Sequence, residues 1–293
     1  MVLTQILEQV LNGLLAGAYY LLIALGLSLI FSLGGLVNLA HGAFYALGAY
    51  FAVVVVERLG LGFAGSAIVS PIVVALIGLV IERFLFRRFY HQDPALGLLL
   101  TFGLAMVAEQ SLRWVFGAAP LPFSIPTGLR GQVFVGDFIY SKYRLLMLGV
   151  AVACVASLWF LLQRTPFGRV VRAGVQNPDM VAALGISLKP YMASIVALSV
   201  GLAALAGVLL APISGVHPAM GAEILTAAFV VVVIGGLGSF WGVVWAALIV
   251  GVVRGLTVYF LPPAADASMY LLMLLVLLIR PRGLTGERIQ RFE

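Results

Sequence analysis

The stretch RTPFGRVVRAGVQNPDMVAALGISL, residues 164–188, gathers three arginines and several other polar residues in a chain that is otherwise strongly apolar. Of the 293 residues, 63% are hydrophobic and 10% are charged, whereas a soluble domain carries about 25% charged residues. The composition therefore predicts an all-α polytopic transmembrane protein. Residues 164–188 are then predicted to form an exposed connection between two membrane helices.

The apolar windows predict nine membrane helices, with eight crossings as an alternative count. Their approximate ranges are 5–31, 42–57, 63–83, 95–117, 145–163, 190–212, 222–236, 240–261 and 267–281. A helix needs about 20 apolar residues to cross a bilayer, so the segments beginning at Ala43 and Ala222 are short. We expect these two to be broken at mid-depth or re-entrant. The whole chain, residues 1–293, is predicted to form one transmembrane domain.

Basic residues orient these helices, because cytoplasmic loops are enriched in lysine and arginine. Under the alternation of nine helices, eleven basic residues share one side: Arg83, Arg87, Arg88, Arg164, Arg169, Arg172, Lys189, Arg280, Arg282, Arg288 and Arg291. Five lie on the other side: Arg58, Arg113, Arg130, Lys142 and Arg144. This bias predicts a cytoplasmic C-terminus, an outside N-terminus and a cytoplasmic 164–188 segment. The net charge of +6 is thus assigned to orientation in a lipid membrane and not to nucleic-acid binding.

The longest connection on the outer side covers residues 117–144 and combines proline, glycine and alternating apolar residues. The alternation of Val133, Val135 and Phe138 is compatible with a short hairpin. The length statistics of connections favour a plain surface loop.

Residues 164–188 carry local signals of a short helix. Asn177 is a typical N-cap, Pro178 suits the first helical position, and Asp179 lies at the positive end of the helix dipole. Gly185 supplies a C-terminal stop. These signals predict a helix of about two turns between Asn177 and Gly185.

Two surfaces are expected on this segment. Met180, Val181 and Leu184 form an apolar side of the short helix, and Arg169 and Arg172 share one side of an earlier turn. The arginines anchor the loop at lipid headgroups in one interpretation. In the other interpretation the segment is a docking element for a soluble partner. An anchor needs charge alone, whereas a docking element also uses the caps and the apolar side.

The segment TPFGRVVRAGVQNPDMVAALGIS, residues 165–187, resembles the cytoplasmic coupling loop of permease subunits of bacterial ABC importers for branched-chain amino acids. That loop carries a Gly-Arg, a following Arg-Ala and a terminal Ala-x-x-Leu-Gly-Ile. Three further stretches resemble motifs of the family in the same order: GGLVNLAHGAFYALGAY (34–50), GVLLAPISGVHPAMG (207–221) and FVVVVIGGLGSFWG (229–242). The resemblance covers nearly the whole chain.

The resemblance implies a coupling helix that sits in a cleft of a cytoplasmic ATPase and transmits its closure to the membrane helices. The implied coupling residues are Gly168, Arg169, Arg172, Ala173, Asp179, Ala182, Leu184 and Gly185. The implied partners are two cytoplasmic ATPase subunits that hold ATP and magnesium, a second related permease subunit and a periplasmic solute-binding protein. The expected location is the bacterial inner membrane. No cofactor is expected on this chain, in which we find no ATPase motif.

Polar residues at a helix break form a second candidate site. Asn38 and His41 lie in a glycine-bounded stretch, where hydrocarbon offers no hydrogen-bond partner. In one interpretation these two residues line the substrate path or a gate. In the other interpretation they form a local cap or an interhelical hydrogen bond. Glycines at helix breaks are further candidates for the path, with helix packing as the alternative: Gly42, Gly235, Gly236 and Gly238.

Glu109 and Arg254 are charges within predicted helices, each in the outer half of the membrane. They can pair with one another and so limit the cost of burial. Arg113 is the rival partner, because it lies four residues after Glu109 on the same helix.

Two other classes of function fit the sequence less well. A self-contained secondary transporter of a small polar solute needs more intramembrane carboxylates than Glu109 supplies. A membrane-embedded enzyme needs a catalytic set. His41, His91 and His217 have no metal-binding spacing, and the single Cys154 is expected to be a small buried hydrophobe, so no metal site is predicted. The substrate class stays open among branched-chain amino acids, other amino acids, amides and urea.

Overall fold

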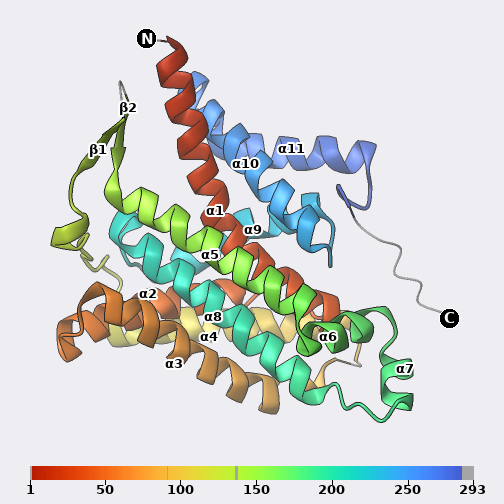
Figure 1. Ribbon diagram of the computed structural model, residues 1–293. Coiled ribbons are helices and arrows are strands. Elements are labelled where there is room, and N and C mark those ends of the chain that lie inside the picture. The colour runs from red at the N-terminus through yellow and green to blue at the C-terminus, as the bar shows by residue number, and fades with distance from the viewer. Residues whose placement is uncertain (1, 91, 136–137, 286–293) are drawn as a thin grey trace.

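The computed structural model describes residues 2–90, 92–135 and 138–285. Within these residues the chain is a bundle of long helices (Figure 1). The long helices are α1 (Val2–Gly34), α2 (His41–Leu59), α3 (Gly62–Phe84), α4 (Pro94–Phe116), α5 (Lys142–Arg164), α8 (Lys189–Ser214), α9 (Met220–Gly235), α10 (Phe240–Phe260) and α11 (Ala265–Ile279). Eight spans are long and apolar enough to cross a membrane, and the last of them, Pro262–Ile279, begins three residues before α11. With 16 residues, α9 falls below this length. The all-α polytopic fold is confirmed. No predicted boundary differs by more than three residues, as at the start of α1, predicted at 5 and observed at 2.

Short elements connect the long helices. They are the 3-10 turns η1 (Phe86–Arg88), η2 (Thr127–Leu129) and η3 (Pro262–Ala264), the strands β1 (Gln132–Val135) and β2 (Phe138–Ser141), and the helices α6 (Pro166–Gln176) and α7 (Pro178–Ala183). The strands form an antiparallel hairpin in which Gln132 lies opposite Ser141. The plain loop that length statistics favour for residues 117–144 is therefore wrong. The connection also contacts the segment between α8 and α9, because Leu121 of the connection forms an isolated antiparallel bridge with Val216 of that segment.

The two ends of the bundle carry different elements. The hairpin, the first turns of α1 and the end of α8 lie at one end, which we call the hairpin end; α6 and α7 lie at the other, the α6–α7 end (Figure 1). The Tyr259 hydroxyl in the last turn of α10 lies 2.8 Å from Gln5 Oε1 in α1, which places the end of α10 at the hairpin end. The end of α10 therefore lies at the end of the bundle that the alternation of nine helices predicts for it.

The helices α1 and α10 approach each other through glycines. Gly13 and Gly17 of α1 face Gly251 and Gly255 of α10. The members of each pair are four positions apart in the sequence, so each pair lies on one helix face. A Cβ on Gly13 would lie 2.5 Å from the Gly251 carbonyl oxygen. Helices in lipid associate through close van der Waals contact between small residues. The four glycines therefore determine how closely α1 packs on α10.

The last described residues dock on the turn between α9 and α10. The Leu284 amide donates to the Ile234 carbonyl oxygen at 2.8 Å, and the Thr285 and Ser239 hydroxyls lie 2.7 Å apart. Gly283 has a φ of +79° and approaches the Gly236 amide too closely to leave room for a side chain. Arg288 and Arg291, which contribute to the predicted orientation, lie outside the described residues, as does His91.

Much of the outer surface of the bundle is apolar. Leu99 and Trp114 of α4 and Ile279 of α11 are 69%, 89% and 80% exposed. Large apolar side chains exposed along whole helices would be exceptional on a soluble monomer. On a membrane protein it is the surface that contacts lipid tails or another membrane subunit.

Candidate functional site

The segment after α5 folds into two consecutive helices, each capped by its own sequence. The Thr165 hydroxyl accepts from the Gly168 amide at 3.2 Å and begins α6. The Asn177 side chain accepts from the Met180 amide at 2.9 Å and begins α7. Gly185 follows α7 with a φ of +76°. The predicted helix after Asn177 is confirmed, and the earlier turn is longer than predicted, since α6 has 11 residues.

Gly168 seats α6 against the end of α5. A Cβ at Gly168 would collide with the backbone carbonyl group of Leu162 and approach the Leu161 carbonyl oxygen to 2.5 Å. Only glycine lets α6 fold back so closely on the last turn of α5. The Arg172 guanidinium donates to the same Leu162 carbonyl oxygen. Arginine at this position stabilises the C-terminal end of α5, where carbonyl groups lack intrahelical partners.

Arg169 and Arg172 lie on one face of α6, as predicted, but their side chains have different surroundings. Arg169 is exposed, whereas Arg172 is half-buried and directed to Leu162 of α5. The spacing of three residues places both on one face of a helix, but Arg172 is long enough to reach back to the preceding helix. The charge available at the surface of α6 is that of Arg169.

The helix α6 also touches the ends of two other membrane helices. A Cβ on Gly174 would lie 3.2 Å from Leu33, in the last turn of α1, and 2.8 Å from Leu188, just before α8. The rings of Phe167 and Tyr191 stack at 5.5 Å between centroids. A displacement of α6 therefore also displaces the ends of α1, α5 and α8 that contact it, because close-packed contacts transmit strain.

The outward surface of this segment is mixed in character. Val181 is 4% exposed and anchors α7, whereas Met180 and Leu184 are 59% and 72% exposed. The predicted coupling residues that reach the surface are Arg169, Ala173, Asp179, Ala182, Leu184 and Gly185. An apolar centre with charges around it is typical of a protein interface.

The break between α1 and α2 is held by α4. α1 ends at Gly34, Gly35 has a φ of +62°, and α2 begins at His41. The Thr101 hydroxyl of α4 donates to the Val37 carbonyl oxygen at 3.1 Å. Gly97 lets Leu36 approach α4 more closely than a side chain would permit. The break is therefore a defined segment with contacts of its own.

Asn38 and His41 are completely buried in this break. The His41 ring lies against Gly26 of α1, where a Cβ would be 2.8 Å from both His41 Nε2 and the Ser199 carbonyl oxygen of α8. Among the described residues, neither side chain has a partner that meets the geometry of a hydrogen bond, although the backbone of Ile23 lies close to the His41 ring. The N-cap residue of α2 is Ala40, and no side chain caps this end of the helix, so the local-cap interpretation is not supported. An unsatisfied buried polar group costs about 1–3 kcal/mol, which favours a function for this site.

The candidate glycines divide into two places. Gly42 lies against Gly221 with no room for a Cβ on either, which joins the starts of α2 and α9 beside His41. Gly235 packs in the same way against Gly242 of α10. The distance from Gly221 to Gly235 along α9 is about 21 Å at 1.5 Å per residue. Gly235 and its neighbours therefore do not join Asn38 and His41 in one site.

Gly236 and Gly238 form the turn between α9 and α10. Their φ angles are +97° and +88°, which L side chains rarely adopt. The position of a Cβ on Gly238 is 3.3 Å from Ser32 Oγ in α1. These two glycines shape a turn at the α6–α7 end.

The predicted pair of Glu109 and Arg254 is wrong. Glu109 pairs with Arg113 at 2.7 Å, and Arg254 pairs with Asp266 of α11 at 3.0 Å. Arg113 lies one helical turn from Glu109, where helix geometry already brings the two charges together. Asp266 lies in the first turn of α11, beside the end of α10.

Exchanging the charges of the observed pair tests this assignment. Arg254→Asp and Asp266→Arg are each expected to lower the melting temperature of the purified protein by about 2–4 °C or less, because an exposed ion pair contributes about 0–1 kcal/mol. The double variant is expected to recover this loss. Thermal unfolding in detergent measures both. Recovery in Glu109→Arg with Arg254→Glu would contradict the observed pairing.

Glu82 is a buried carboxylate that the sequence motifs did not select. It is 2% exposed near the end of α3 and lies beside Tyr90. Its Oε1 accepts no hydrogen bond from the part of the chain that the structure describes. The signal in the sequence is a single acidic residue in a long apolar window.

A multi-pass bundle with a capped polar segment at one end belongs to the class of polytopic membrane proteins, and comparison with known proteins narrows this class. The chain belongs to the family described as branched-chain amino acid transport system permease component, whose model matches residues 9–279. The family resemblance of the motifs is confirmed.

Three curated relatives illustrate the match. The chain is 28% identical to the high-affinity branched-chain amino acid transport system permease protein LivH of Salmonella typhimurium, over 96% of each protein. It is 29% identical to the corresponding protein BraD of Pseudomonas aeruginosa, again over 96% of each. It is 30% identical to LivM of Salmonella typhimurium, over 90% of this chain and 67% of LivM. Among solved structures, PsaBC from Streptococcus pneumoniae in complex with Fab aligns with a TM-score of 0.46 and 16% identity, over 96% of this chain and 92% of that chain.

Proposed function

We propose that this chain is the permease subunit of an ABC importer in the bacterial plasma membrane. It carries branched-chain or related small amino acids that a periplasmic binding protein delivers. Separate cytoplasmic subunits bind and hydrolyse ATP with magnesium. The observation that carries this proposal, beside the family membership, is the capped α6–α7 segment with its exposed Met180 and Leu184.

In this proposal the α6–α7 end faces the cytoplasm, as the arginine bias predicts. Two ATPase subunits act on a pair of permeases, this chain and a related one. Similarity to both LivH and LivM supports such a pair, since each is named as a permease protein of a high-affinity branched-chain amino acid transport system. The apolar surfaces of α4 and α11 provide area for lipid and for the second permease.

The packing suggests how movement of an ATPase reaches the transport path. When α7 is pulled, α6 moves as one body with the end of α5, because Gly168 and Arg172 both lie against Leu162. Gly174 passes the movement to Leu33 in the last turn of α1. The α1–α2 break follows immediately, so its geometry changes with α6.

Asn38 and His41 then act as the gate of the path. Their polar atoms are shielded in the described conformation, and a shift of the break exposes them to water and to the solute. Thr101 holds one side of the break on α4 while α1 moves on the other side. This is alternating access without covalent chemistry.

Reconstitution tests the proposal. The chain, its co-encoded permease and the ATPase subunits are placed in proteoliposomes with the binding protein and radiolabelled L-leucine. We expect uptake that requires ATP and all subunits, and that releases leucine unaltered. Uptake by this chain alone, driven by a proton or sodium gradient, would establish the rival secondary transporter. Chemical alteration of the solute would establish a membrane enzyme.

A further inference from the structure

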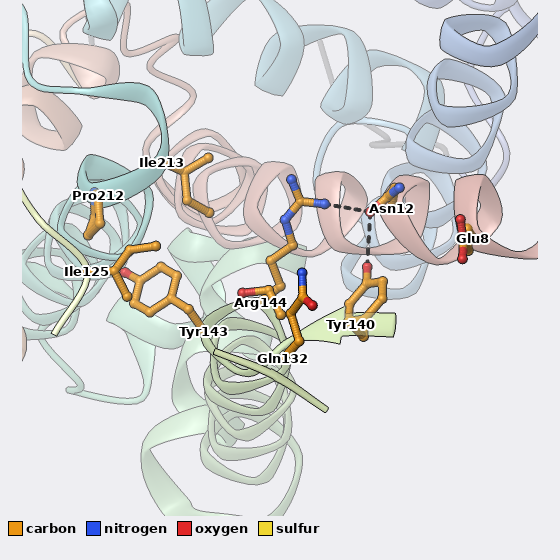
Figure 2. Close-up of a pocket in the computed structure, with 10 residues that line it drawn as sticks. Glu8, Asn12, Ile125, Gln132, Tyr140, Tyr143, Arg144, Pro212 and Ile213 are labelled. Carbon is orange, nitrogen blue, oxygen red and sulfur yellow. Dashed lines mark hydrogen bonds between the residues drawn. The ribbon is translucent and has the colours of Figure 1, made fainter. Parts of the chain in front are cut away.

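A cavity of about 510 Å³ lies at the hairpin end of the bundle (Figure 2). Its walls come from the first turns of α1, the segment before η2, the strands of the hairpin, the first turn of α5 and the end of α8. The size falls within the range of small-molecule sites, about 300–1,000 Å³. The cavity is separate from the α6–α7 segment and from the break at His41.

One part of the cavity is polar and charged. Asn12 Oδ1 accepts from Arg144 Nη1 at 2.6 Å and from the Tyr140 hydroxyl at 3.2 Å. Glu8 lies one helical turn before Asn12 on the same face of α1. Within the described ranges of the chain, neither Glu8 nor Arg144 forms a salt bridge. A carboxylate and a guanidinium thus line one space without neutralising each other directly.

The polar groups are suited to donate and accept at neutral pH. Burial raises the pKa of the Tyr140 phenol above its usual value, and the neighbouring Arg144 acts in the opposite direction. Tyr140 therefore stays a neutral hydrogen-bond donor. Arg144 uses one of its five N–H groups for Asn12, which leaves others for a carboxylate.

The other part of the cavity is apolar. Ile125, Pro212 and Ile213 lie together on the side away from Glu8, as Figure 2 shows. Tyr143 adds its ring to this wall, because its hydroxyl donates to the Leu209 carbonyl oxygen at 2.6 Å and is satisfied there. A ligand that is charged at one end and aliphatic at the other matches both parts.

We propose that this cavity binds a free amino acid with an apolar side chain. Arg144 binds the carboxylate, Glu8 binds the ammonium group, and Ile125 and Ile213 contact the side chain. Glu8 and Asn12 are four residues apart, about 6 Å along α1, and Arg144 is held at Asn12, which leaves space beside Glu8 for a group carrying both charges. The inference rests on the proposed function and deepens it. The cavity receives the solute after the binding protein releases it and before it reaches the break at His41.

The test measures equilibrium binding of radiolabelled L-leucine to the purified full-length chain in lipid nanodiscs. Arg144→Met and Glu8→Gln are each expected to raise the Kd by about tenfold or more, because each removes a charge-assisted hydrogen bond. Lys142→Met is the matched control: Lys142 is an exposed base at the start of the same helix as Arg144 and does not line the cavity. Its Kd is expected to stay within about twofold of wild type.

Two leucine analogues keep the test valid if a variant folds poorly. Leucinamide lacks the carboxylate, so its binding is expected to be the same in wild type and Arg144→Met. 4-Methylpentanoate lacks the ammonium group, so its binding is expected to be the same in wild type and Glu8→Gln. A misfolded variant would bind neither analogue. If the contacts are specific, Arg144→Met weakens the binding of 4-methylpentanoate alone, and Glu8→Gln weakens the binding of leucinamide alone.

Several results would overturn the inference. They are the absence of leucine binding to the wild-type chain, unchanged leucine affinity in both variants, and an effect of the variants on association with the binding protein alone. ATP-driven uptake by the wild-type complex is measured in parallel. If uptake persists while the binding prediction fails, the proposed function stands and only the cavity assignment is lost. Lack of ATP-driven uptake contradicts the proposed function itself.

Discussion

Replacing Gly168 with alanine is expected to abolish leucine uptake driven by ATP while the protein still inserts into the membrane. The added Cβ collides with the Leu162 carbonyl group, so α6 must move away from α5. Overpacking of this kind costs about 1–3 kcal/mol, and here it acts on the contact that transmits movement. ATP hydrolysis by the complex is expected to continue without transport. Measuring both rates in the same proteoliposomes separates uncoupling from loss of protein.

Gly149→Ala is the matched control for this change. Gly149 lies on α5, the helix that seats α6, and a Cβ there meets no atom within 4 Å. Alanine is a better helix former than glycine by about 1 kcal/mol, so this variant should transport as well as wild type. Normal coupling in Gly168→Ala would refute the proposed path of movement through α6.

Replacing Gly251 with alanine is expected to cause the largest loss of stability. The new Cβ collides with the Gly13 carbonyl oxygen and approaches the Gly17 amide nitrogen to 2.6 Å. Because backbone atoms cannot rotate away as side chains do, α1 and α10 must separate. We expect a loss of about 1–3 kcal/mol or more and a markedly lower yield of folded protein. Thermal unfolding in detergent and the folded fraction on gel filtration measure it.

The control for Gly251→Ala is an alanine substitution that is not expected to lower stability. Gly103 lies on α4, where a Cβ meets no atom within 4 Å. Gly103→Ala therefore gains helix propensity without a collision and should be as stable as wild type or slightly more stable. Equal melting temperatures for the two variants would show that the close approach of α1 and α10 is dispensable.

Features that depend on neighbouring residues were predictable from the sequence. The membrane helices follow from apolar windows, because the bilayer demands a minimum length of apolar chain. The start and stop of α7 follow from Asn177, Pro178 and Gly185, since capping groups bond to amides within a few residues. Burial of Asn38 and His41 at a break follows from their position between glycines and an apolar helix.

Features that depend on distant contacts were not predictable. Nothing local to Arg172 indicates that it bonds to Leu162, because the fold of α6 against α5 must exist first. Arg254 pairs with Asp266 through the packing of two helices, which periodicity does not reveal. The cavity was missed for the same reason, since Asn12 and Arg144 meet only after α1 and α5 have packed.

The packing of α1 on α10 also bears on how the protein is made. Gly13 leaves the ribosome 238 residues before Gly251 (251 − 13), a delay of about 10–50 s at about 5–20 residues per second. During this interval the glycine face of α1 lies in the membrane without its native neighbour. We therefore expect nascent α1 to be retained beside the translocation machinery until α10 arrives. The packing around α1 is then completed late, after most of the chain has been synthesised.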